Sequence, residues 1–221
     1  MQKKNDMNKI SYLKLSLFFV FLFILAVAGF WNSYFSLFIN DFKDIQYLIH
    51  IHALFASLWI IILIIQPYLL FMNKIKLHKT YGNFSKLIFI LLTASIVVII
   101  LLKLHFNQYN LDISIFVPFK DIILLFVGAG IGYSNTSNLV VHRKGMILTA
   151  IAMIEPALIR LLFTSKIVPN HHVFLTTIII IYTLLLYLIL TDTDKSRFNV
   201  LYPLTLIYLI ISHVIIVYYT L

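Results

Sequence analysis

Two histidines, His52 and His213, stand inside long apolar runs, each about seven residues from the end of its run. Two imidazoles at one depth on different membrane helices can supply the axial ligands of a b-type haem. His78 and His142 form a second pair, each just before an apolar run. The spacing therefore predicts an outer haem pair, His52 with His213, and an inner pair, His78 with His142. The alternative for the outer pair is structural hydrogen bonding, and for the inner pair it is a position facing solvent or lipid headgroups.

A polar stripe runs along the second apolar segment, where His52, Trp59 and Gln66 follow one another at steps of seven residues. Seven residues are nearly two turns of an α-helix, so the three side chains share one face. We expect this face to contact protein rather than lipid, because the histidine and the glutamine need hydrogen-bond partners.

Ionisable residues also occupy the middle of an apolar run at 145–165, where Glu155 precedes Pro156 and Arg160 follows. The proline removes a backbone donor and predicts a kink. Arg160 matches Asp121 of the preceding run in depth, so we expect those two to pair, leaving Glu155 without a basic partner. A protonatable carboxyl near the membrane midplane indicates either a proton path or a structural hydrogen bond at the kink.

The elements that position these residues are seven apolar runs, each long enough to cross the ~30 Å hydrocarbon core of a bilayer. They cover residues 15–39, 46–72, 83–104, 119–140, 145–165, 172–191 and 199–220. We therefore predict an all-α fold, an integral membrane bundle of seven transmembrane helices. Residues 1–14 form a basic cytoplasmic N-terminal tail, and residues 15–221 form a single transmembrane domain. Gly128 and Gly132 make a G-x-x-x-G pattern that lets a neighbouring helix approach closely.

The net charge of +9 suggests nucleic acid, but 12 of the 17 basic residues lie on alternate connections between the runs. The positive-inside rule assigns those connections to the cytoplasm, which places the N-terminus inside and the C-terminus outside. The predicted partner is the lipid bilayer of the cell inner membrane, with no role for nucleic acid. The absence of cysteine excludes disulfides, thiolate metal sites and covalent c-type haem.

Several segments together resemble an uncharacterised bacterial family of polytopic membrane proteins with about seven helices and unknown function. The matching segments are residues 29–35 (F-W-x-S-Y-F), 52–67 (H-x6-W-x6-Q-P), 77–82 (L-H-x-x-x-G), 142–146 (H-K-R-x-M) and 155–160 (E-P-A-x-x-R). The resemblance implies a shared architecture and no particular reaction. Lys144 stands where many relatives have arginine, which argues against bidentate anion binding there. The paired histidines also resemble the pattern of cytochrome b561-like proteins.

Three functions remain open on these residues. The first is a b-haem electron carrier, a subunit rather than a stand-alone enzyme, with a quinone or a redox protein as its partner. The second is a proton- or metal-coupled transporter that uses Glu155, Arg160 and Asp121 together with the histidines near the outer face. The third is a non-catalytic sensor or assembly partner whose polar residues only hold the helices together.

Overall fold

The computed structural model describes residues 2–40, 47–106, 113–192, 194 and 196–220, and every regular element in them is a helix. In this part of the chain seven helices are long and apolar enough to cross a membrane. They are α1 (Gln2–Gly29), α3 (Tyr47–Phe71), α4 (Ile75–Phe106), α5 (Ile113–Ser134), α6 (Leu139–Ser165), α7 (Val173–Thr191) and α8 (Leu201–Thr220). The predicted all-α fold with seven transmembrane helices is confirmed, and the chain is a multi-pass membrane protein.

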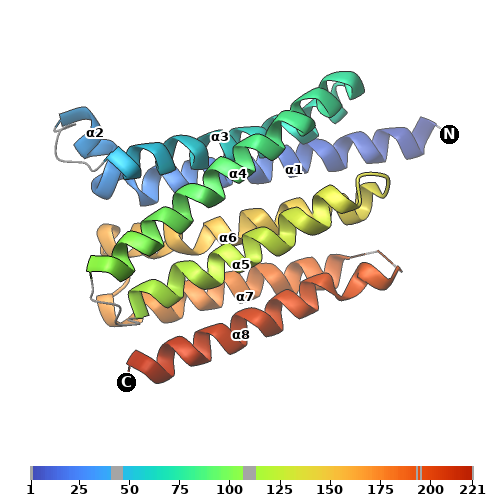
Figure 1. Ribbon diagram of the computed structural model, residues 1–221. Coiled ribbons are helices and arrows are strands. Elements are labelled where there is room, and N and C mark those ends of the chain that lie inside the picture. Colours follow the sequence, from blue (N-terminus) through green and yellow to red (C-terminus); the bar gives the residue numbers. More distant parts are fainter. Residues whose placement is uncertain (1, 41–46, 107–112, 193, 195, 221) are drawn as a thin grey trace. The chain divides into compact units, whose positions relative to one another are not determined.

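Short elements connect some of these helices. A π-helical turn, η1, and the short helix α2 follow α1, and two 3-10 turns precede α7 and α8 (Figure 1). Their bounds are Trp31–Phe35 for η1, Ser36–Asn40 for α2, Asn170–His172 for η3 and Arg197–Val200 for η4.

The helices begin and end differently from the apolar runs, because polar residues continue a helix beyond the apolar stretch. The runs at 119–140 and 145–165 predicted a break near residue 142, whereas α5 ends at Ser134 and α6 begins at Leu139. Asn138 starts α6 by accepting hydrogen bonds from the main-chain N–H groups of Val140 (3.2 Å) and Val141 (3.3 Å). This is an ordinary N-cap, and it leaves a connection of only residues 135–138.

Contacts along the chain divide it into two compact units, Met1–Leu101 and Leu102–Leu221. In the first unit α1 packs against α3 (Figure 1). The turn between α3 and α4 is tight: Asn73 adopts φ 57°, and the Lys74 N–H donates to the Leu69 oxygen at 2.8 Å. This is the left-handed C-cap arrangement in which asparagine is tolerated well.

In the second unit α6 is the most buried helix. α5 packs on α6 and α8, and α7 packs on the same two helices (Figure 1). The buried positions of α6 continue from Val141 to Leu158 with few interruptions. Polar residues on this helix therefore face protein, which is where a polar site in a membrane protein has to be.

The contact between α5 and α6 is made by glycine. A Cβ atom added to Gly145 of α6 would lie 2.6 Å from the main-chain oxygen of Gly128 and 2.7 Å from the Cα of Gly132. The two backbones therefore touch directly, and the close approach predicted from the G-x-x-x-G pattern is confirmed.

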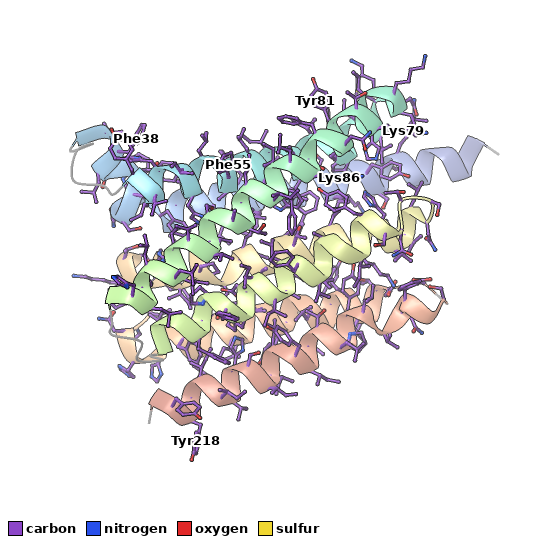
Figure 2. All side chains as sticks on the ribbon, viewed as in Figure 1. Phe38, Phe55, Lys79, Tyr81, Lys86 and Tyr218 are labelled. Atoms are coloured by element: carbon purple, nitrogen blue, oxygen red, sulfur yellow. The ribbon has the colours of Figure 1, made fainter. Side chains whose placement is uncertain are left out.

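Large apolar and aromatic side chains are exposed on these helices, as expected of a lipid-facing surface. Figure 2 shows Phe38, Tyr81 and Tyr218 projecting from their helices, and Tyr218 is 76% exposed. In lipid these side chains have no need of a protein partner.

Candidate functional site

The centre of the site is Glu155 of α6, whose side chain is 3% exposed. Lys120 of α5 is equally buried, and its Nζ donates to Glu155 Oε2 at 2.7 Å. The expectation that Glu155 lacks a basic partner is therefore wrong. A charged lysine inside a membrane-spanning helix is stable only beside such a partner.

The same lysine holds Asp121. Lys120 Nζ donates to Asp121 Oδ1 at 2.7 Å, and the aspartate side chain is 16% exposed. We expected Asp121 to pair with Arg160. Instead Arg160 has an exposed side chain and its Nη1 donates to the main-chain oxygen of Pro156 at 2.8 Å. The prediction of Arg160 was wrong because it used only the depth of each residue in the membrane. The direction in which each side chain leaves its helix also decides which groups meet.

On its other side Glu155 contacts the histidine of α8. His213 Nε2 lies 3.1 Å from Glu155 Oε2, and His213 Nδ1 lies 2.9 Å from the Tyr182 hydroxyl of α7. One tautomer satisfies both contacts: the Nε2–H donates to the carboxylate, and Nδ1 accepts from the tyrosine O–H. His213 is 3% exposed.

Five side chains from four helices thus form one hydrogen-bonded series, which we call the relay cluster: Tyr182, His213, Glu155, Lys120 and Asp121. A further hydrogen bond joins α8 to the main chain of α5 beside the cluster: the Tyr208 hydroxyl donates to the main-chain oxygen of Lys120 at 2.7 Å. The cluster joins α5, α6, α7 and α8, and it lies wholly in the second unit.

A second buried lysine, Lys144, lies near the start of α6. Its Nζ donates to Asp192 Oδ2 (2.5 Å), Asp194 Oδ2 (2.9 Å) and the main-chain oxygen of Phe198 (3.2 Å). The bonds from Lys144 and from the Ser196 N–H lower the pKa of Asp194 to about 2, so the aspartate stays charged into strongly acidic solution. All three ammonium hydrogens are used, which ties α6 to the connection between α7 and α8.

The polar stripe of α3 faces α4 at all three positions. His52 Nδ1 lies 3.0 Å from Ser95 Oγ, and the Trp59 ring packs on Phe89 with centroids 5.3 Å apart. When the Gln66 side-chain amide is oriented with its nitrogen toward His78, its oxygen accepts a hydrogen bond from the Gly82 N–H at 2.9 Å. The expectation that this face contacts protein is confirmed.

The four histidines predicted as haem ligands are distributed over both units. His52 and His78 belong to the first unit, and His142 and His213 belong to the second. Each predicted pair would therefore need one histidine from each unit, and the haem site stays a prediction. His213 uses both ring nitrogens within the relay cluster. Among the described residues no three His, Cys, Asp or Glu side chains are grouped as in a metal site.

Lys120 and Tyr182 of the relay cluster were not singled out from the sequence, and the contact of Lys144 with Asp192 and Asp194 was not predicted. Lys120 lies just inside the predicted run at 119–140 beside Asp121, and this adjacent pair of charges was the signal that could have identified it. Lys144 lies in a basic segment that also fits an interface. Tyr182 has no distinguishing neighbours in the sequence, because tyrosine is common at many depths in this chain.

Comparison with known proteins adds no relative. The chain matches no protein-family model, no curated protein sequence and no solved structure. The resemblance to the seven-helix bacterial family stays a prediction, and the function has to be argued from the relay cluster.

Proposed function

We propose that this membrane protein is a proton-coupled transporter in which the relay cluster carries the proton. The observation that supports the proposal is the unbroken series of contacts from Tyr182 through His213, Glu155 and Lys120 to Asp121. Each step in it is 2.7–3.1 Å long. Titratable side chains in such a series, inside helices that cross a bilayer, are the groups that proton pathways use.

The histidine is the natural transfer group of this series. Imidazole passes a proton on because one ring nitrogen accepts while the other releases. A proton that reaches His213 Nδ1 is balanced by the proton that leaves Nε2 for Glu155 Oε2, so the ring returns to a neutral form. Release of the proton from Glu155, protonation of the Tyr182 oxygen and rotation of the imidazole ring then restore the first arrangement. Lys120 keeps the two carboxyl groups in place and offsets their charge.

Proton uptake into proteoliposomes tests this proposal. A potassium gradient with valinomycin would provide an inside-negative potential, and an internal pH dye would report the initial rate. We expect the purified protein to exceed empty liposomes clearly, and Glu155→Gln to lower the protein-dependent rate at least about tenfold, the usual scale for losing one proton-transfer group.

A tyrosine pair on α7 provides the matched control. Tyr182→Phe removes the hydroxyl at the end of the series, whereas Tyr187→Phe removes one from a side chain that is 62% exposed. We expect the first variant to be slow and the second to match the original protein. A protein-dependent rate that survives Glu155→Gln would exclude the relay cluster from proton transfer.

A b-haem electron carrier is the second candidate, and the tautomers of two histidines favour it. Ser95 Oγ donates to the main-chain oxygen of Leu92 at 2.6 Å, so its lone pair accepts from His52 Nδ1–H. His142 Nδ1–H likewise donates to the Gly132 oxygen at 2.7 Å. Both rings then carry the hydrogen on Nδ1, which is the tautomer that a second partner imposes on a metal-ligating imidazole.

An optical spectrum separates the two candidates. Protein expressed in a haem-replete host and purified in detergent would be measured oxidised and then reduced with dithionite. A Soret band that shifts on reduction and is lost in His52→Ala or His142→Ala would support the electron carrier. A featureless spectrum would remove it, and a protein that also fails to move protons would fit the non-catalytic sensor or assembly role.

A further inference from the structure

One oxygen of the relay cluster has no partner. Glu155 Oε2 accepts from both Lys120 and His213, whereas Glu155 Oε1 is buried and makes no hydrogen bond to any described residue. Buried carboxylate oxygens in proteins nearly always have a donor or a bound cation. The atom therefore points to a ligand at this position.

The charges around the cluster favour a cation as that ligand. At ion-pair distance in the described part of the chain, the single ammonium group of Lys120 faces the two carboxyl groups of Asp121 and Glu155. One ammonium group cannot neutralise two carboxylates, so the cluster favours a further cation in this dry environment.

A second oxygen is available on the same helix. Pro156 has no N–H, so the main-chain oxygen of Ala152 cannot receive the usual α-helical hydrogen bond from residue 156. Ala152 is buried and lies one turn before Glu155. In transporters, main-chain carbonyl oxygens that lack their helical hydrogen bond are known sodium ligands.

We propose that a small monovalent alkali cation binds between Glu155 Oε1 and the main-chain oxygen of Ala152. Both residues are at least 95% buried, so the occupant is a small ion and not an organic amine. Hard cations prefer oxygen ligands of these two kinds. Binding of this cation does not depend on proton transfer. Only a role of the cation as the coupled ion in transport rests on the proposed function.

Equilibrium binding of radioactive ²²Na⁺ to the purified full-length protein in detergent tests the site. Choline chloride would keep the ionic strength constant, and unlabelled NaCl would compete. We expect saturable binding of about one ion per chain, lost in Glu155→Gln. Asp194→Asn is the control, because it also replaces a lysine-paired carboxylate by an amide and lies outside the relay cluster, in contact with Lys144. It is expected to bind ²²Na⁺ as the original protein does.

A second variant tests the site without touching the carboxylate. Pro156→Ala restores an N–H that bonds to the Ala152 oxygen, so we expect ²²Na⁺ binding to weaken at least about fivefold, on the scale of one lost ligand contact. Absence of saturable binding by the original protein, or unchanged binding in both Glu155→Gln and Pro156→Ala, would overturn the cation site. Neither result bears on proton uptake, which is measured separately in proteoliposomes.

Discussion

Replacing Lys120 by methionine is expected to destabilise the protein by about 3–5 kcal/mol, the range measured when one member of a buried ion pair is removed. Methionine keeps the length and apolar character of the side chain, so packing against α6 should change little. What changes is charge: Glu155 loses its ammonium partner at 2.7 Å, and so does Asp121. Thermal unfolding in detergent, followed by circular dichroism and by the monodisperse fraction, would measure the loss.

Two variants show whether charge is the cause. Lys79→Met removes a lysine from an exposed position on α4 (Figure 2) and should leave the unfolding temperature nearly unchanged. The double variant Lys120→Met with Glu155→Gln removes a carboxylate together with its partner and should recover a large part of the stability. If the double variant is no more stable than Lys120→Met alone, the loss comes from packing and not from the uncompensated Glu155.

The second large effect is expected at Gly145, where substitution by alanine should cost about 1–3 kcal/mol or more, as overpacking in a well-packed core does. The new methyl group would meet main-chain atoms of Gly128 and Gly132, and main chain cannot rotate away as a side chain can. α5 and α6 would have to separate, and that separation would also lengthen the bond from Lys120 to Glu155. We therefore expect Gly145→Ala to lower both the unfolding temperature and the rate of proton uptake.

Gly130→Ala is the matched control, because it is the same substitution at a position without close neighbours. A Cβ atom at Gly130 meets nothing within 4 Å, and the residue is exposed on α5. Since alanine is the better helix former by roughly 0.5–1 kcal/mol, Gly130→Ala should be neutral or slightly stabilising. Equal destabilisation by the two substitutions would mean that the cost at Gly145 does not come from the close contact between α5 and α6.

The fold could be predicted from the sequence because lipid imposes a simple rule. A segment that crosses a bilayer has to be long, apolar and helical, so the seven runs identified the seven helices. The ends were less predictable. α4 begins at Ile75, eight residues before the apolar run at 83–104, because lysine and histidine continue a helix at a membrane boundary without difficulty. Hydropathy reports which residues lie in lipid, whereas the start of a helix depends on local capping, as at the N-cap Asn138 of α6.

The site could be predicted only in part. Spacing alone identified the face of α3 that carries His52, Trp59 and Gln66, since one helix fixes the relation among its own residues. Partners on different helices require the rotation of each helix, and the sequence of a single chain does not contain it directly. For this reason Glu155 and His213 were both singled out, but their contact with one another was not predicted, and neither was the contact of Lys120 with Glu155.

The connection of residues 135–138 between α5 and α6 also bears on how the protein enters the membrane during synthesis. A charged residue at the centre of a lone helix costs about 2.5–3.5 kcal/mol on insertion. Helices joined by so short a link leave the translocon nearly together, so Lys120 and Glu155 can partition as a neutral pair. α8 with His213 is made later, and it joins a hairpin whose charges have already met. Lengthening this connection would therefore lower the efficiency of membrane insertion more than the stability of the folded protein.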